Sequence, residues 1–137
     1  MYITLETDYA VRIVAYLSGL GEGRADSRTI SGQTNVPPRF TVKILRKLSV
    51  GGLVGSCKGP RGGYFLARPA QKITLLDVVE LIEGACVISR CEQGGYLCQQ
   101  SSCRFYNVYS EISRELREKL ADYTFDQFAA STEESEK

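Results

Sequence analysis

The sequence predicts a mainly α-helical fold with a small β-hairpin wing, arranged as a winged helix-turn-helix domain followed by a long C-terminal dimerisation helix. Two observations predict the domain: short amphipathic segments follow one another in the first half, and a Gly- and Pro-containing turn then separates two β-prone runs. A third predicts the appended helix, because an apolar stripe at helical spacing extends over about five turns near the end. With 137 residues and 43% hydrophobic content, the chain can bury one core.

The first element is expected to be an amphipathic helix over residues 8–20. Its apolar residues recur at the spacing i, i+3, i+4, i+7, at Ala10, Ile13, Val14 and Leu17. Thr7 or Asp8 can accept the N-cap hydrogen bond, and the glycines from Gly19 onward end the helix. One face of this helix should therefore be buried.

Two further helices are expected over residues 26–34 and 37–50, with the second beginning at a proline pair. The cationic face of the second helix holds Arg39, Lys43, Arg46 and Lys47. Its apolar face, expected in the core, holds Phe40, Ile44, Leu45 and Leu48. Two short helices with a basic second member are typical of a helix-turn-helix with a recognition helix, although a solvated basic face explains the stripe equally well.

A β-hairpin is expected next, with strands over residues 53–57 and 64–67 around a turn that carries two cations. A hairpin directly after a recognition helix is typical of a DNA-binding wing, and this order of elements argues against an ordinary exposed hairpin. We therefore expect double-stranded operator DNA as the partner. The expected contacts are Arg39, Lys43 and Lys47 on the helix and Lys58 and Arg61 in the wing.

A fourth helix is expected over residues 73–83, capped by Thr74 and ended by Gly84, and a long helix begins at Arg104. The apolar stripe of the long helix consists of Phe105, Val108, Tyr109, Ile112, Leu116, Leu120 and Tyr123. A symmetric partner is the simplest surface to cover it, so we expect a homodimer. The chain then divides into a winged domain (1–84), a cysteine-rich loop (85–103), a dimerisation helix (104–128) and a disordered acidic tail (129–137).

The charge distribution and the missing residue types narrow the function classes. Residues 1–70 hold ten Lys or Arg and four Asp or Glu, net +6, whereas residues 71–137 hold seven and twelve, net −5. A basic half joined to an acidic half favours a polyanion-binding front. The chain has no histidine, which excludes Cys-His and Ser-His catalytic pairs, and no phosphate-binding motif, so an enzyme is not expected. It also shows no leader pattern and no run of about 18 apolar residues, which predicts a cytoplasmic protein with no membrane partner.

Four of the five cysteines lie between residues 86 and 103, in a segment without sustained periodicity. A reducing compartment disfavours a static disulfide framework. Six residues separate Cys91 from Cys98, and four separate Cys98 from Cys103. Converging thiolates can bind zinc or an iron–sulfur cluster, and the absence of a C-x₂-C pair favours the cluster mildly. A metal-free thiol loop remains an alternative.

Taken together, these motifs resemble the Rrf-type family of winged helix-turn-helix transcriptional regulators, from Met1 to about Phe128. The resemblance rests on four segments: Thr7-Asp8-Tyr9-Ala10-Val11-Arg12, Ile44-Leu45-Arg46-Lys47-Leu48 leading to Gly52-Leu53-Val54, Lys58-Gly59-Pro60-Arg61-Gly62-Gly63-Tyr64, and the three cysteines before a long helix. It implies a dimeric regulator, most simply a repressor, that senses redox state, nitric oxide or iron supply through a cluster. The competing interpretations are a cluster-free winged-helix regulator that uses thiol oxidation or zinc, and a small iron–sulfur electron-transfer or assembly protein.

The resemblance also implies a ligand set of Cys91, Cys98 and Cys103. Relatives with a histidine ligand place it three residues after the last cysteine, where this chain has Tyr106. Other relatives use a carboxylate from the first helix of the partner subunit, and Asp8 stands at the matching place. A role as helix N-cap is the alternative explanation for Asp8. The other candidates for the fourth ligand are Cys86, Glu6 and Glu92. A carboxylate ligand favours a 4Fe–4S cluster, with 2Fe–2S possible.

Overall fold

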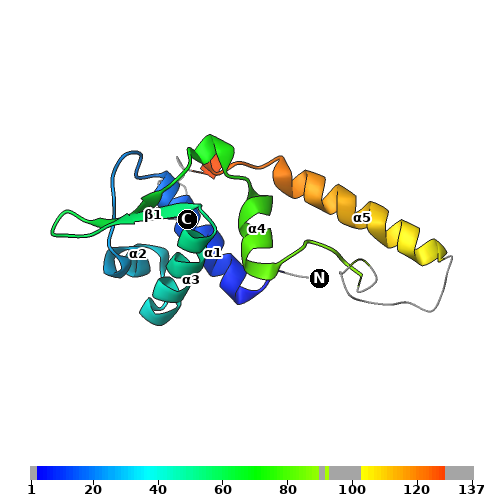
Figure 1. The fold of residues 1–137 in the computed structure, drawn as a ribbon, viewed down its shortest axis with the longest axis horizontal. Coiled ribbons are helices and arrows are strands. Elements are labelled where there is room, and N and C mark those ends of the chain that lie inside the picture. The colour runs from blue at the N-terminus through cyan, green and yellow to red at the C-terminus, as the bar shows by residue number, and fades with distance from the viewer. Residues whose placement is uncertain (1–2, 90–91, 93–102, 129–137) are drawn as a thin grey trace, which may run out of the picture.

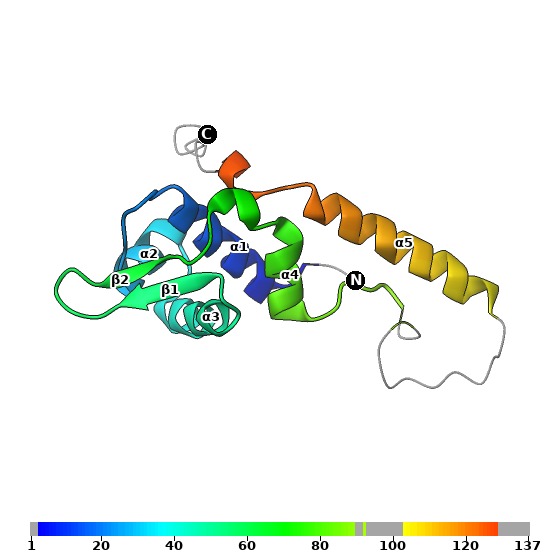
Figure 2. The same ribbon diagram turned by 45° about the horizontal axis from the view of Figure 1, so that its top comes forward.

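The structure is a computed structural model that describes residues 3–89, 92 and 103–128. Its elements are α1 (Leu5–Ser18), α2 (Ser27–Thr34), α3 (Pro38–Val50), β1 (Val54–Cys57), β2 (Gly63–Leu66), η1 (Ala70–Lys72), α4 (Leu75–Glu83), α5 (Arg104–Ala121) and η3 (Phe125–Phe128). Helices α1 to α4 and the hairpin form one body, and α5 extends away from it (Figures 1 and 2). The predicted winged helix-turn-helix with a long C-terminal helix is confirmed.

The core of the winged domain forms around α1. Its residues Ala10, Ile13 and Val14 are completely buried, as the helical spacing predicts. They pack in one cluster with the buried face of α3, whose members Ile44, Leu45 and Leu48 are also completely buried. Burial of each such side chain stabilises the fold by about 1.5–3 kcal/mol. The opposite face of α3 is thereby turned to solvent.

Helix α1 begins three residues earlier than the sequence predicts. Thr4 is the N-cap, and its Oγ1 accepts a hydrogen bond from the backbone N–H of Thr7 at 3.2 Å. The prediction of Thr7 or Asp8 as the cap is wrong, because the first turn carries exposed Leu5 and gives no apolar periodicity. Asp8 therefore lies inside the helix, and a capping role does not account for it.

The hairpin is a two-stranded antiparallel sheet in which Val54 pairs with Leu66 and Cys57 with Gly63. At Gly62 a Cβ atom would lie 2.2 Å from the carbonyl oxygen of Cys57, so the turn requires glycine there. The segment before α2 joins the hairpin: the N–H of Tyr64 donates to the carbonyl of Ala25 at 2.7 Å. This unpredicted pairing attaches β2 of the wing to the segment that precedes α2.

The C-terminal end of the described chain returns to the winged domain. Helix α5 ends at Ala121 and does not continue to residue 128, because the following backbone pairs with the start of α4. The N–H of Leu75 donates to the carbonyl of Tyr123 at 2.8 Å, and the N–H of Phe125 donates to that of Ile73 at 3.1 Å. Phe125 is completely buried, and Figure 2 shows this orange segment beside η1 and the top of α4.

A carboxylate at the end of α4 holds the start of α1. Glu83 Oε1 accepts hydrogen bonds from the hydroxyls of Thr4 and Thr7, the latter at 2.5 Å. These bonds, that of Thr4 first, lower the pKa of Glu83. Since the folded-state pKa is depressed, the ionised carboxylate stabilises the fold above its ordinary pKa, and this contribution is lost as the pH falls through the lowered value.

We expect Glu83→Gln to lower the free energy of unfolding by about 0.5–1 kcal/mol at pH 7, because the bonds involve an exposed charged group. Urea unfolding of the variant and the wild type at neutral pH and at pH values below the lowered pKa measures this. The difference should shrink in acid. Glu22→Gln, at an exposed position between α1 and α2, is the control and should be neutral at both pH values. A Glu83→Gln effect that is constant with pH would contradict this explanation.

Candidate nucleic-acid interface and cysteine site

The exposed face of α3 is strongly basic. Arg39, Lys43 and Arg46 are exposed and Lys47 is half-buried. Arg46 lies on this face with the others, although the sequence-based list of expected contacts omits it. Phe40 does not join the core as predicted: its side chain is 38% exposed, and its ring lies 5.7 Å from that of Tyr9 in α1. It occupies the first turn of α3, at the edge of the apolar face, where no second element covers it fully.

The two lysines of α3 face a carboxylate of α1. Lys47 Nζ lies 2.6 Å from Glu6 Oε1, and Lys43 Nζ lies 3.9 Å from the same oxygen. The Glu6 side chain is 26% exposed. Two of the three predicted contact residues of α3 therefore share one acidic neighbour, which the sequence indicates only as a possible metal ligand.

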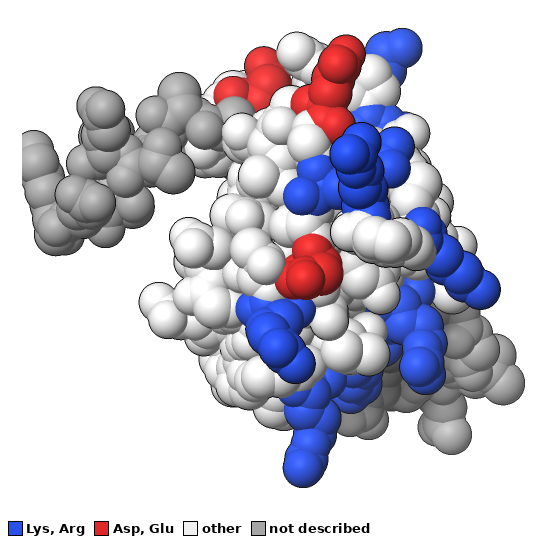
Figure 3. Space-filling view, turned by 90° about the vertical axis from the view of Figure 1, so that its left-hand side faces the viewer, with Lys and Arg blue, Asp and Glu red and all other residues white. Residues whose placement is uncertain are grey.

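The wing presents its cations at the same end of the molecule. Lys58 and Arg61 are exposed in the turn between β1 and β2. Two further cations were not predicted from the sequence: Arg24, whose guanidinium lies 5.5 Å from the ring centre of Phe65 in β2, and the exposed Arg28 in α2. Figure 3 shows lysine and arginine side chains predominating on the face that carries the hairpin and α2. A surface of this kind can bind the phosphates of a duplex.

Of the three cysteines predicted as ligands, the structure describes Cys103 only. Cys103 is half-buried and directly precedes α5 as its N-cap residue. Cys91 and Cys98 lie outside the described residues. Among residues 3–89, 92 and 103–128, no three Cys, Asp or Glu side chains lie close enough together to hold a metal ion. Cys57 is half-buried in the wing and Cys86 is buried between α4 and α5.

The chain on the N-terminal side of Cys91 is anchored to α5. The completely buried Ser113 accepts a hydrogen bond from the backbone N–H of Ile88 at 2.9 Å and donates one to Glu92 Oε2 at 2.8 Å. Arg117 donates to the carbonyl of Cys86 at 3.0 Å. Since Cys103 begins the same helix, both ends of the cysteine loop are attached to α5.

The four candidates for a fourth ligand have different surroundings. Burial raises the pKa of the Cys86 thiol, and the charge of Glu80 acts in the same direction. Glu6 is directed at Lys47, and Glu92 accepts hydrogen bonds from Ser113 and from the N–H of Ser89. Asp8 pairs with Arg12 at 2.8 Å, and both side chains are 46% exposed. The Asp8 side chain is thus more open to solvent than that of Glu6, which is 26% exposed.

Helix α5 has two faces with different roles. Ser113 and Arg117 are on the face that contacts Cys86, Ile88 and Glu92. A second face, about 100° away around the helix, exposes Phe105, Val108, Tyr109 and Ile112, with exposed fractions of 66%, 48%, 39% and 44%. Four neighbouring exposed apolar side chains are unusual on the surface of a monomer and indicate an interface.

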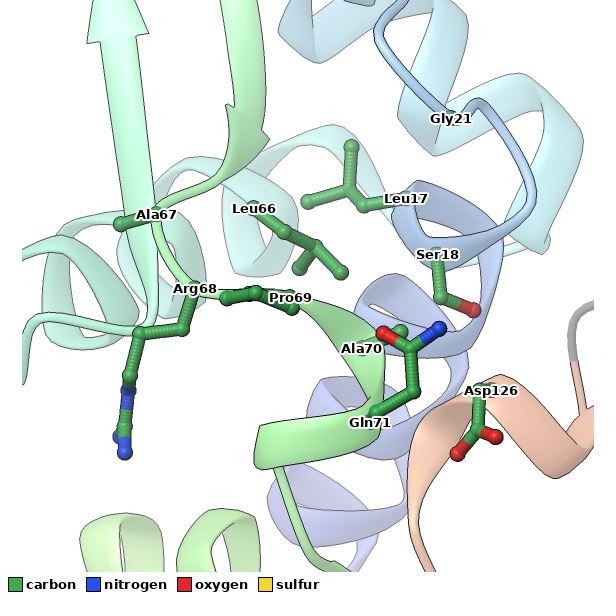
Figure 4. A pocket seen from close by; sticks show the side chains of 10 residues that line it. All are labelled: Leu17, Ser18, Gly21, Leu66, Ala67, Arg68, Pro69, Ala70, Gln71 and Asp126. Atoms are coloured by element: carbon green, nitrogen blue, oxygen red, sulfur yellow. The ribbon is translucent and has the colours of Figure 1, made fainter.

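The described part of the chain also contains an open cavity of about 570 Å³ between the end of α1, the segment after β2, and η3. Figure 4 shows Gln71 and Asp126 near Ser18 at one side, and Arg68 pointing away from them. None of the predicted site residues lines this cavity. Within the described part of the chain, no helix combines the length and the apolar character needed to span a bilayer.

Comparisons with known proteins agree with this architecture. Residues 3–131 match the Rrf2 family, described as an iron-dependent transcriptional regulator. Protein aau3 of Rhizobium meliloti (strain 1021) is 34% identical over 128 residues, which are 92% of this chain and 83% of that protein.

Two solved structures share the fold at lower identity. CymR, the global cysteine regulator of B. subtilis, superposes with a TM-score of 0.80 at 22% identity, covering 96% of this chain and 98% of that one. IscR of T. potens superposes with a TM-score of 0.78 at 21% identity, covering 97% and 90%. The family match spans the winged domain, the cysteine segment and α5. The chain therefore belongs to the Rrf2 family of transcriptional regulators.

Proposed function

We propose that this chain is a cytoplasmic, operator-binding repressor whose affinity for DNA depends on an iron–sulfur cluster held by Cys91, Cys98 and Cys103. The observation that carries the DNA-binding part is the basic surface formed by α3 and the wing at one end of the molecule. The cluster part rests on the three closely spaced cysteines and on the match to a family described as iron-dependent. The division into winged domain, cysteine loop, dimerisation helix and tail is part of this proposal.

In the proposed complex, α3 enters the major groove and the wing lies along the backbone. Arg39 reads a base edge or binds phosphate in a bidentate manner, while Lys43, Lys47, Lys58 and Arg61 neutralise phosphates. Arg39 is the strongest candidate for sequence-specific contact because it is exposed in the first turn of α3, and recognition helices place their N-terminal residues against the bases.

The matching experiment measures the affinity of Arg39→Ala for an operator duplex selected from random DNA. We expect a loss of about 1–3 kcal/mol on that operator, and a smaller loss on a duplex of unrelated sequence. Arg114→Ala, which removes an exposed arginine from the polar side of α5, is the matched control and should bind as the wild type does. Equal losses for the two variants would contradict the assignment of α3.

The donor set suits a cluster chemically, because soft thiolates bind iron–sulfur centres. Cys103 is held at the start of α5, and Ser113 and Arg117 anchor the other end of the loop through Ile88 and Cys86. We propose the carboxylate of Asp8 from the partner subunit as the fourth ligand of a 4Fe–4S cluster. The Asp8 carboxylate is 46% exposed, and its ion pair is with the equally exposed Arg12 of the same helix. The Glu6 carboxylate is instead paired with Lys47 of α3, and that of Glu92 accepts a hydrogen bond from the buried Ser113. A bound cluster would supply reactivity toward oxygen or nitric oxide, and it would respond to iron supply.

We propose a homodimer in which the exposed apolar face of α5 packs against its counterpart. Asp8 as a ligand would then tie α1 of one subunit to the cysteine loop of the other. Helix α1 contacts α3 of its own subunit through the Tyr9 and Phe40 rings and through the Glu6 and Lys47 ion pair. Any shift of α1 therefore changes the placement of the recognition helix. The DNA fixes the spacing of the two half-sites, so a change in the separation of the two recognition helices weakens binding.

A further inference from the structure

Glu6 is the acidic residue that contacts the cationic face of α3. Its Oε1 atom lies 2.6 Å from Lys47 Nζ and 3.9 Å from Lys43 Nζ, so one carboxylate faces two of the cations proposed to bind phosphate. The lysine side chains are 39% and 57% exposed, which leaves both within reach of a DNA backbone. An anion at this place competes with the operator for the same charges.

The first turn of α1 is held firmly enough to keep this carboxylate in position. Thr4 and Thr7 donate hydrogen bonds to Glu83 on one side of the turn. On the other side, the ring of Tyr9 packs against that of Phe40 in α3. Glu6 lies between these two attachments, and its orientation toward α3 follows from them.

We propose that Glu6 lowers the operator affinity by neutralising Lys47, and to a smaller extent Lys43, until the ion pair opens. The proposal rests on the assignment of α3 as the DNA-reading helix under the proposed function. A lysine already paired with a carboxylate releases fewer counterions from DNA when it approaches a phosphate. The carboxylate itself repels the phosphates that approach Lys43 and Lys47.

The ion pair is also adjustable. Glu6 and Asp8 belong to the same turn of α1, so a movement that follows a new bond to Asp8 changes the distance from Glu6 to Lys47. Lys47 then becomes available to phosphate or is withdrawn from it. Glu6 thus acts as a positioning residue, through the lysines, on the strength of DNA binding.

The test measures the operator affinity of the full-length protein between about 0.05 and 0.3 M KCl, by anisotropy of a labelled duplex. We expect Glu6→Gln to raise the affinity about threefold to tenfold at the low-salt end, and to steepen the slope of log K against log salt by about 0.9 for each lysine released. A merely structural role of Glu6 would not steepen this slope. Since misfolding weakens binding, the expected gain has a sign that misfolding cannot produce.

Lys47→Gln provides the reciprocal variant. In the wild-type background it should change the slope of log K against log salt by much less than the value of about 0.9 expected for one lost phosphate contact. The reason is that Lys47 is already paired with Glu6. In the Glu6→Gln background it should remove most of the gain. Glu22→Gln removes the same charge in the segment between α1 and α2, beyond the opposite end of α1, and is the control, expected to match the wild type.

The outcomes separate this inference from the function on which it rests. If Arg39→Ala weakens operator binding while Glu6→Gln changes neither affinity nor slope, the role of Glu6 is overturned and the DNA-reading role of α3 stands. An equal gain from Glu22→Gln would also overturn it, because the effect would then be one of net charge. If Arg39→Ala has no effect either, the proposed DNA surface itself is wrong.

Discussion

Cys103→Ala is expected to abolish the proposed iron–sulfur cluster. The variant removes a thiolate at the start of α5, and a cluster with two remaining cysteine ligands lacks the donors that hold it against loss. Anaerobically purified wild-type protein should be coloured and contain iron and sulfide in matching amounts. The variant should contain less than about a tenth of these amounts and should be colourless.

The control for this change is Cys57→Ala, which removes a cysteine from the wing, outside the loop. It should retain the iron, the sulfide and the visible absorption of the wild type. Zinc in the wild-type protein in place of iron, or full retention of the cluster in Cys103→Ala, would contradict the proposed ligand set. The first result would favour a zinc-binding regulator with the same DNA-binding surface.

Ile112→Asp is expected to dissociate the proposed homodimer. Ile112 is the last residue of the exposed apolar face of α5, with Val108 one turn before it and the half-buried Leu116 one turn after it. A carboxylate there would be buried without a partner at the interface, which costs several kcal/mol for each subunit. The molar mass by sedimentation should fall to that of one chain. The operator affinity should fall by about 100-fold or more, because a monomer binds one half-site only.

Asn107→Asp is the matched control, because it introduces the same charge on the opposite, polar side of α5. It should remain dimeric and bind operator as the wild type does. If Ile112→Asp also remains dimeric with unchanged affinity, another surface joins the subunits, and the dimerisation role of α5 is wrong.

The sequence predicts best those elements whose signals are local. Helix α2 follows Asp26, whose carboxylate accepts a hydrogen bond from the N–H of Thr29 at 2.7 Å. Helix α4 has a capping box, in which Thr74 and Asp77 each accept a backbone hydrogen bond from the other. Such caps and the helical apolar spacing lie within a few residues of chain, so both helices are readable without tertiary information.

The features that the sequence does not reveal depend on contacts between distant segments. Phe125 enters the core through backbone pairing with Ile73, and no local pattern indicates this return. The start of α1 is fixed by Glu83, nearly the whole winged domain away in sequence. Likewise, the basic face of α3 is predictable from spacing, whereas the pairing of Lys47 with Glu6 requires the packing of α1 against α3.

The proposed cluster is expected to change the affinity of this protein for its operator. The most direct test titrates one labelled operator duplex with the same preparation before and after anaerobic removal of the cluster by a chelator, at fixed salt. We predict that the two dissociation constants differ by about tenfold or more, which corresponds to a coupling free energy of about 1.4 kcal/mol. Equal dissociation constants for the cluster-loaded and cluster-free protein would contradict the proposed dependence of operator affinity on the cluster, whatever the colour of the preparation.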